Sequence, residues 1–372
     1  MPKAVNLLII QQIFPPFRDS FFTKLGSAKE INLTVVCGKP HHSKARVSRE
    51  NHDVIKVRPI TNLFFGPSGN ITYQLGVLGR VAEANPDIII MEFNLRIVTL
   101  WVLFFLRLFK PFKLVLWGHG FGPRPSKAIK WIRIFLAKKS DALILYGEKA
   151  AIEFCEGGVQ NDKINVAHNS IDTAEINMLL SKKHASDRCT LTFVGRLIKG
   201  KKVDLLLKAL PLMRPDVLSK IEVAIIGDGP EKKNLMEFTK RQGLSNKVEF
   251  YGSITSEKTL AEFFNSSFAC VSPGYIGLNA IHSLAYRVPL IVANREEHSP
   301  EIEALKHKEN SIFFESDNAR MLADAITQLF LDRQCAELLW GTQSEKFCER
   351  FSTEAMVKKF VSVVSDLQVA EH

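Results

Sequence analysis

The chain has 372 residues, of which 46% are hydrophobic and 24% charged, so it is long enough for two globular domains with separate cores. No apolar run reaches the roughly 20 residues that span a bilayer, and the short apolar run near the N-terminus lacks a signal-peptide pattern. The six cysteines are scattered without a CxxC pair, which predicts reduced cytosolic thiols and argues against a metal site.

The formal net charge of +10 lies entirely in the N-terminal half. Residues 1–170 contain 23 Lys and Arg against 12 Asp and Glu, a net +11, and the remaining residues contain 26 against 27, a net −1. The excess is densest from Arg96 to Lys139, which has ten basic residues and no acidic one. Such a one-sided distribution indicates an anionic partner, and a solubilising basic face is the alternative.

The N-terminal half alternates short apolar runs with helical stretches. Near-continuous Val, Ile and Leu predict strands that are buried on both faces, as in a parallel sheet. The predicted strands cover Val5–Ile10, Leu33–Cys37, Ile88–Met91, Leu114–Trp117 and Ala142–Tyr146. The fourth strand leads into a glycine-rich loop, and we expect His119 in this loop to point into a cleft, although a lone histidine is more often structural.

The segment from Ser126 to Lys139 is both basic and apolar, with its charges at near-helical spacing. Lys127, Lys130 and Arg133 surround Trp131 in this segment. This composition suits attachment to an anionic membrane surface, and we predict that role for these four residues. The alternative is an ordinary amphipathic helix that packs on the sheet.

The C-terminal half repeats the alternation of strands and helices. Such alternation over the whole chain predicts an α/β protein of two doubly wound, Rossmann-like domains facing a cleft. We expect domains at residues 1–175 and 187–345, followed by a helical segment at 346–372. The predicted strands of this half cover Leu191–Val194, Val223–Ile226, Val248–Phe250, Ala269–Ser272, Leu290–Val292 and Ser311–Phe314.

Three glycine turns follow strands of this half in a fixed order. They lie at Gly195–Leu197, Gly227–Glu231 and Ser272–Leu278. A glycine turn between strand and helix lets backbone N–H groups approach an anion at the positive end of the helix dipole. One such turn is an ordinary βα connection, but three in order, with Arg196 and Lys201 beside the first, predict a nucleotide diphosphate site.

These turns resemble the donor domain of GT-B glycosyltransferases. Gly195-Arg196-Leu197 with Lys201, Gly227-Asp228-Gly229-Pro230-Glu231, and the segment from Ser272 to Pro289 are most similar to family 4. Members of this family use nucleotide-sugar donors with retention at the anomeric carbon. The resemblance is strong over about residues 187–330 and weaker over the N-terminal half, and it implies that the C-terminal helix returns to the first domain.

The resemblance implies roles for individual residues. Arg196 and Lys201 would contact the donor diphosphate, and the N–H groups of Gly277 and Leu278 would meet the distal phosphate at the start of a helix. Breaking the bond between sugar and diphosphate leaves an anionic leaving group, which these donors would stabilise without a metal ion. Apart from the donor substrate, no cofactor is expected.

The donor site also departs from the family pattern. Gly229 and His282 would lie at the donor nucleoside or sugar, but the family has two glutamates where this chain has Gly274 and His282. The first glutamate touches the donor sugar in the family, and the second binds the ribose hydroxyls. Lys202 also replaces a residue that is usually glycine. The identity of the donor therefore cannot be inherited from better-known members.

In the N-terminal half, the resemblance places His119 near the donor sugar and acceptor as the candidate catalytic residue. Arg18, in the loop after the first strand, would lie on the acceptor side and meet a phosphate there.

The whole pattern predicts a metal-independent, retaining hexosyl or deoxyhexosyl transferase. It would act on a lipid-linked saccharide during assembly of O-antigen, capsule or exopolysaccharide, as a peripheral protein on the cytoplasmic face of the membrane. The alternatives are a nucleotide-sugar epimerase of the same fold and a catalytically inactive partner subunit, which Gly274 and His282 favour. A nucleic-acid partner is not expected, because the basic stretch lacks a recognition motif.

Overall fold

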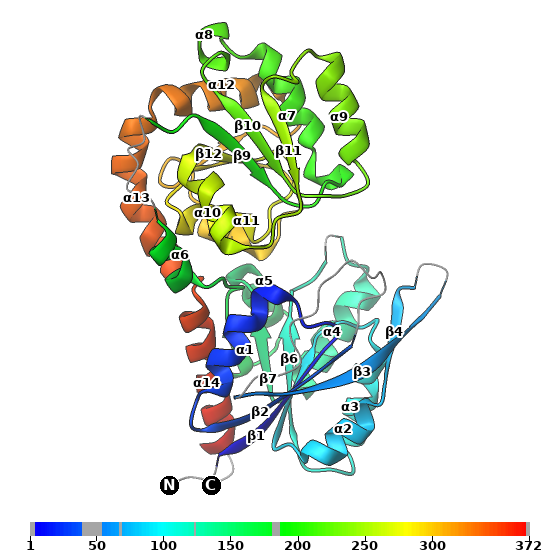
Figure 1. Ribbon diagram of the computed structural model, residues 1–372. Helices are drawn as coiled ribbons and strands as arrows, with labels where there is room; N and C mark the ends of the chain where they lie inside the picture. The colour runs from blue at the N-terminus through cyan, green and yellow to red at the C-terminus, as the bar shows by residue number, and fades with distance from the viewer. Residues whose placement is uncertain (1–3, 39–53, 67–68, 123, 181–186, 370–372) are drawn as a thin grey trace. The chain divides into compact units, whose positions relative to one another are not determined.

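The protein consists of two α/β units (Figure 1). The computed structural model describes residues 4–38, 54–66, 69–122, 124–180 and 187–369. The first unit comprises Met1–Asn169 and Thr353–His372, and the second comprises Ser170–Ser352. Each unit has one largely parallel sheet between layers of helices, which confirms the predicted fold class of two doubly wound domains.

The sheet of the first unit has the strand order β4-β3-β2-β1-β5-β6-β7-β8. Neighbouring strands are parallel except for β3 and β4. The sequence did not predict β3, β4 and β8, because β3 lacks a continuous apolar run and contains Pro59, and β4 and β8 are short. The strands are β1 (Val5–Gln11), β2 (Ile31–Gly38), β3 (Lys56–Phe65), β4 (Ile71–Leu75), β5 (Ile88–Glu92), β6 (Lys113–Gly118), β7 (Ala142–Leu145) and β8 (Ile164–Val166).

Helices cover both faces of this sheet. One face packs against α1 (Asp19–Gly26) and α14 (Thr353–Val369). Phe360 of α14 packs against Trp117 and Phe21 with ring centroids 4.9 Å away from each, which attaches the C-terminal helix to the first unit. Full burial of a side chain of this size contributes about 1.5–3 kcal/mol. The other face packs against α2 (Val77–Ala84), α3 (Val98–Leu106), α4 (Lys127–Lys139) and α5 (Glu148–Glu156).

The sheet of the second unit is entirely parallel, in the order β11-β10-β9-β12-β13-β14. Its strands are β9 (Thr190–Val194), β10 (Glu222–Ile226), β11 (Val248–Gly252), β12 (Ser267–Ser272), β13 (Leu290–Ala293) and β14 (Ser311–Phe314). One face packs against α7 (Val203–Ala209), α9 (Lys232–Arg241) and α12 (Ala319–Leu331), and a short helix, α8, spans Pro215–Leu218. The other face packs against α6 (Thr173–Leu179), α10 (Glu257–Ser266), α11 (Asn279–Ala285) and α13 (Arg333–Glu349).

The boundaries of the units differ by a few residues from the expected ones. The Asp172 carboxylate caps α6 by accepting hydrogen bonds from the N–H groups of Ala174 and Glu175, both at 3.2 Å. Ile176 of this helix and Cys348 of α13 are buried in the core of the second unit. The second unit therefore begins before residue 175 and continues past residue 345. Residues 181–186 of the expected linker lie outside the described residues.

Each sheet has one point at which the order of its strands reverses, and the loops on its two sides run in opposite directions. In the first sheet β1 lies between β2 and β5, and in the second β9 lies between β10 and β12, so each strand order reverses there. Connections on the two sides of such a point run to opposite faces, which leaves room for a ligand at the carboxyl ends of the strands. The predicted phosphate turns follow β9, β10 and β12, and the His119 loop follows β6.

Candidate active site

The first two glycine turns interlock at the carboxyl ends of β9 and β10. The Gly195 N–H donates to the Ile226 carbonyl at 3.0 Å, and the Leu197 N–H donates to the Asp228 carbonyl at 2.9 Å. A Cβ atom on Gly229 would lie 2.3 Å from the Leu197 carbonyl oxygen. Gly229 was predicted to contact the donor nucleoside or sugar, and the close approach of the two turns is by itself a reason for a glycine at this position.

Lys201 connects the first turn with the third. Its ammonium donates to the Tyr275 carbonyl oxygen at 2.7 Å and lies 3.8 Å from the centre of the Tyr275 ring. The Tyr275 N–H in turn donates to the Gly200 carbonyl at 3.3 Å. The carboxyl ends of β9 and β12 are therefore joined through the two loops that the sequence assigns to the diphosphate.

Arg196 and Lys201 form a pair of like charges beside these loops. Burial, followed by the positive charge of Arg196, lowers the pKa of Lys201 to about 8, while Glu301 opposes the change. The Arg196 side chain is exposed and forms no hydrogen bond or ion pair with any residue that the structure describes. A bound anion would stabilise such a pair of neighbouring cations.

The start of α11 supplies one further donor. The Leu278 N–H has no hydrogen-bond acceptor among the described residues, whereas the Gly277 N–H donates to Asn279 Oδ1 at 3.1 Å. The Asn279 amide is itself held by the Ser272 hydroxyl at 2.6 Å. Both N–H groups were predicted to meet the distal phosphate. The Leu278 N–H could donate to a phosphate without a change in its contacts, whereas the Gly277 N–H would first have to leave the Asn279 side chain.

The first unit has a hollow of about 510 Å³ at the carboxyl ends of β1, β5 and β6. His119 lines this hollow with its side chain exposed, and its ring lies 4.7 Å from the Tyr146 ring. Desolvation by the surrounding protein, and then the charges of Arg18 and Arg133, lower the pKa of His119. The imidazole is therefore neutral near pH 7, and it can accept or donate a hydrogen bond.

Arg133 is not part of the outer surface, which corrects its predicted role in membrane contact. Its buried guanidinium donates to the carbonyl oxygens of Phe93 at 3.1 Å and His119 at 2.8 Å. The position of Arg133, three and four residues before Leu136 and Ala137, puts it on the buried side of α4. Burial lowers the pKa of Arg133 to about 10. Arg133 thus holds the backbone of the His119 loop.

Arg18 is also buried, and it also lines the hollow. It donates to the Tyr146 hydroxyl at 2.7 Å and to Asn169 Oδ1 at 3.2 Å, and its guanidinium lies 4.4 Å from the centre of the Trp117 ring. Because Tyr146 contacts His119, Arg18 helps to fix the wall behind the imidazole. Its predicted contact with a phosphate of the acceptor stays a prediction.

Glu92 is a site residue that the sequence analysis missed. It is the last residue of β5 and lines the hollow that contains His119. Burial raises the pKa of the Glu92 carboxyl. Hydrogen bonds from the Gln12 backbone and the Asn94 side chain oppose this change but do not cancel it. The sequence contained a signal for Glu92, because a carboxyl group directly follows the buried run Ile88–Met91. Arg196 and Lys201 were predicted as site residues from the same kind of position, after the buried strand β9.

The other residues predicted to face a membrane are exposed. Lys127, Lys130 and Trp131 all lie on the solvent side of α4, and 66% of the Trp131 surface is accessible. No helix among the described residues is long and apolar enough to cross a membrane. The same residues include no group of three or more His, Cys, Asp or Glu side chains placed to hold a metal ion.

Known families and structures match both units. The model described as "Glycosyl transferases group 1" matches residues 179–355, and "Glycosyltransferase Family 4" matches residues 26–175. The crystal structure of HepE from Anabaena in complex with UDP has a TM-score of 0.73 at 18% identity, covering 97% of this chain and 99% of that one. The chain belongs to the GT-B glycosyltransferases and is family 4-like.

Two curated relatives of this family 4-like chain match only part of its length. An uncharacterized glycosyltransferase, MJ1607 of Methanocaldococcus jannaschii, is 24% identical over 64% of this chain and 63% of its own length. The GDP-mannose-dependent alpha-(1-6)-phosphatidylinositol monomannoside mannosyltransferase of Mycobacterium tuberculosis is 25% identical over 58% of this chain and 56% of its own length. The matches therefore span less than two thirds of each relative.

Gly274 has a structural reason in this family 4-like chain. A Cβ atom there would lie 2.1 Å from the Gly200 carbonyl oxygen and 2.8 Å from the Lys201 carbonyl carbon. The loop after β9 thus occupies the space into which the family's first glutamate would project. With the loop in this position, residue 274 has no room for a glutamate side chain.

Restoring the family residue should therefore damage the site. Gly274→Glu is expected to lower the free energy of unfolding by about 1–3 kcal/mol, because backbone atoms must move to admit the side chain. Denaturant unfolding and calorimetry with UDP or GDP measure the effect, with the exposed Gly122→Glu, whose Cβ has open space, as the control. Unchanged stability together with tighter nucleotide binding in Gly274→Glu would contradict this account.

His282 and Lys202 both have partners within the second unit. The His282 ring nitrogens lie 3.3 Å from a Glu257 carboxylate oxygen and 3.2 Å from the Leu278 carbonyl, which supports a structural role over the predicted contact with the donor. Lys202 has a left-handed φ of 49°, which explains why glycine is usual there. Its ammonium pairs with Glu296 at 2.6 Å and Asp317 at 2.8 Å.

Binding of a nucleoside diphosphate should weaken as the pH rises above about 8. The negative charge of the ligand favours the protonated ammonium, so the pKa of Lys201 is higher in the complex than in the free protein, where it is about 8. Binding above that pH takes up a proton, and the affinity falls as the pH increases. Calorimetry with UDP and GDP in two buffers of different ionisation enthalpy measures both quantities, and Lys201→Ala should remove the dependence. A constant affinity from pH 7 to 9.5 in the wild type would contradict it.

Proposed function

We propose that this protein transfers a hexosyl or deoxyhexosyl group from a nucleoside diphosphate sugar to a lipid-linked saccharide, with retention at the anomeric carbon. The observation that supports the donor class is the pair of neighbouring cations, Arg196 and Lys201, in the loop after β9 at the switch point of the second sheet. Lys201 joins this loop to the loop after β12, which also contains the Leu278 N–H. Retention and the lipid-linked acceptor follow the resemblance to family 4.

The transfer needs no metal ion under this proposal. The bond between C1 of the sugar and the diphosphate oxygen breaks, and C1 bonds to an acceptor hydroxyl oxygen, whose proton leaves for a base or for the departing diphosphate. Arg196, Lys201 and the Leu278 N–H would stabilise the negative charge that accumulates on the leaving group. Their charges supply what a divalent cation supplies in metal-dependent transferases.

Several features support an acceptor at a membrane. The first unit contains the hollow with His119 and Glu92, and residues 1–170 have a net charge of +11. The mycobacterial relative is named for a lipid acceptor, a phosphatidylinositol monomannoside. We propose that the protein acts on the cytoplasmic face of the membrane, in the assembly of a surface polysaccharide such as O-antigen, capsule or exopolysaccharide.

One assay separates this proposal from its rivals. Nucleotide release is measured from UDP-, GDP- and dTDP-sugars with and without extracts of membrane lipids, and the configuration of the glycolipid product is determined by NMR. Release that requires the lipid extract, persists in EDTA and gives a retained linkage is expected. Conversion of the donor to an epimeric sugar without any acceptor, detected by NMR, would favour an epimerase. Nucleotide binding without turnover of any donor would favour an inactive partner subunit, which the departures at Gly274 and His282 make the second candidate.

A further inference from the structure

The first unit exposes aromatic side chains on two of its helices. Trp101 and Phe105 are four residues apart on α3, and Trp131 and Phe135 are four residues apart on α4, so each pair lies on one side of its helix. Leu108 and Phe109, directly after α3, are 75% and 70% exposed. We call these six residues the aromatic surface. Large apolar groups gathered in this way mark a site of interaction.

Some of the aromatic side chains contact one another while they remain exposed to solvent. The Phe105 and Phe109 rings pack edge to face at 5.2 Å, and the Trp131 and Phe135 rings stack at 5.6 Å. The Trp101 indole N–H donates to the Leu95 carbonyl at 3.1 Å, which leaves the hydrocarbon edge of the ring as its exposed part. The ring contacts and the Trp101 hydrogen bond restrict these aromatic side chains, which lowers the conformational entropy lost when a partner covers them.

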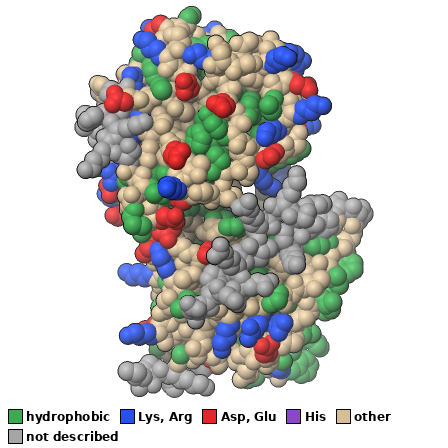
Figure 2. Space-filling view, in the orientation of Figure 1, with side chains coloured by type: hydrophobic (Ala, Val, Ile, Leu, Met, Phe, Trp, Pro, Cys, Tyr) green, Lys and Arg blue, Asp and Glu red, His purple; other side chains and the backbone are tan. Residues whose placement is uncertain are grey.

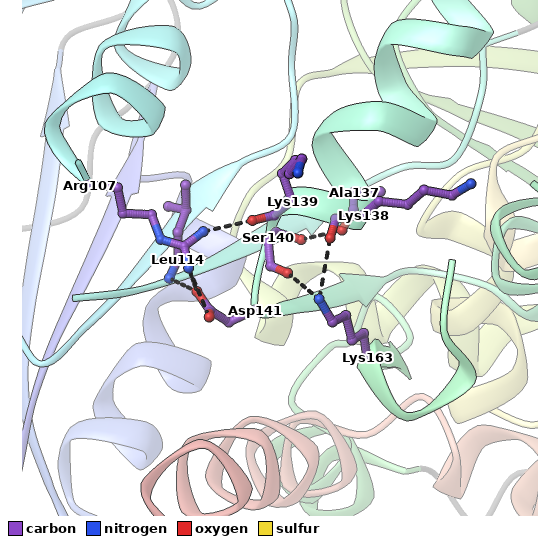
Figure 3. A network of polar contacts seen from close by, with 8 residues as sticks. All are labelled: Arg107, Leu114, Ala137, Lys138, Lys139, Ser140, Asp141 and Lys163. Atoms are coloured by element: carbon purple, nitrogen blue, oxygen red, sulfur yellow. Dashed lines mark hydrogen bonds and ion pairs between the residues drawn. The ribbon is translucent and has the colours of Figure 1, made fainter. Parts of the chain in front are cut away.

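A hydrogen-bond network joins the ends of the two helices (Figure 3). Arg107, directly after α3, donates to the carbonyl oxygen of Lys139, the last residue of α4, at 2.7 Å, and pairs with Asp141 at 2.7 Å. Asp141 also accepts from the Leu114 N–H at 2.7 Å, which anchors the network in the sheet. The network thus joins the C-terminal ends of α3 and α4, which both pack on the same face of the sheet.

The segment that contains the aromatic surface is basic. Lys110, Lys130, Lys138 and Lys139 are exposed in it, and the segment Arg96–Lys139 has no acidic residue. Figure 2 shows hydrophobic side chains along the right margin of this unit, where Figure 1 places α2, α3 and β4. An apolar centre with a lysine rim fits an anionic lipid surface, because lysine stems extend along apolar material while their ammonium groups reach phosphates.

We infer that the aromatic surface inserts into the interfacial region of an anionic bilayer. A second copy of the chain would bring two lysine rims together, and their repulsion disfavours it. Insertion differs from attraction by charge alone, because burial of aromatic rings persists at a salt concentration that screens the lysines. The inference extends the proposed function by identifying the surface that would hold the enzyme at its lipid-linked acceptor, and it rests on that proposal only for the identity of the acceptor.

Vesicles of phosphatidylglycerol and phosphatidylcholine test the insertion. Sedimentation should show stronger binding than to pure phosphatidylcholine, with part of it retained in high salt, and brominated lipids should quench tryptophan fluorescence. Phe105→Ser with Phe109→Ser should weaken binding at least tenfold at both salt concentrations. Met236→Ser with Met321→Ser, two residues of the second unit that are 48% and 45% exposed, should have no effect. Lys127→Glu with Lys130→Glu should weaken binding at low salt only. Arg133 is left unchanged because it is buried.

The outcomes are distinct from those of the transfer assay. Wild-type vesicle binding by the Phe105/Phe109 variant, or wild-type protein whose tryptophans are not quenched by brominated lipid, overturns the insertion. Thermal melts and calorimetry with UDP or GDP check that the variants remain folded and bind nucleotide as the wild type does. Insertion without turnover of any sugar donor would leave the aromatic surface established and reject the proposed transfer. Transfer without vesicle binding would support the proposed transfer and reject the insertion of the aromatic surface.

Discussion

Replacement of Arg196 or Lys201 by alanine should weaken nucleoside diphosphate binding by at least about tenfold. A charge-assisted hydrogen bond contributes about 1.5–3 kcal/mol, and the two side chains lie beside the loops that follow β9 and β12. The Lys201 variant should show the larger loss of rigidity in the loop, because its ammonium also holds the Tyr275 carbonyl. Calorimetry with UDP and GDP measures the affinities, and unfolding in denaturant separates binding from stability.

Lys199 provides the matched control for this pair. It lies in the same loop, two residues before Lys201, and its side chain is exposed. Lys199→Ala should therefore bind nucleotide nearly as well as the wild type does, apart from a small salt-dependent effect. Equal affinity in the wild type, Arg196→Ala and Lys201→Ala would mean that the diphosphate does not bind at these loops.

His119→Ala should lower turnover at least about tenfold and leave nucleotide affinity nearly constant. General acid–base catalysis typically contributes about 10²–10⁴-fold, and we take about tenfold as the smallest loss because His119 has a smaller effect if it only positions the sugar. The side chain is exposed in the hollow, and its backbone is held by Arg133 rather than by its own ring, so removal of the imidazole should not unfold the loop. Steady-state kinetics and calorimetry on the same samples measure the two effects.

His119→Gln separates two explanations of such a loss. Glutamine can donate and accept hydrogen bonds but does not titrate, so it should restore part of the turnover if the imidazole only orients a sugar. Turnover as low as in His119→Ala would indicate proton transfer. Wild-type turnover in both variants would assign His119 to a structural role, and attention would then shift to Glu92, whose carboxyl group lines the same hollow.

The amino-acid sequence by itself determined the architecture and the composition of the loops that are predicted to bind phosphate. Continuous apolar runs such as Leu114–Trp117 and Leu290–Val292 have no polar face, so they must lie inside a parallel sheet covered on both sides. Glycine turns with Arg196 and Lys201 after such runs indicated anion binding, because both the chain direction and the residue types are local information. The missed strands were those with polar alternation or few residues, for which the local signal is weak.

Only the tertiary structure decided which polar residues face solvent and which face the protein. Arg133 belongs to a basic helix in the sequence, but the carbonyl groups of Phe93 and His119, directly after β5 and β6, hydrogen-bond its buried guanidinium. Comparison with the family's glutamate predicts the loss of a donor contact at Gly274, and the structure adds that the backbone of Gly200 and Lys201 fills the space beside it. These contacts join residues far apart in the chain, and no local pattern encodes the distance between them.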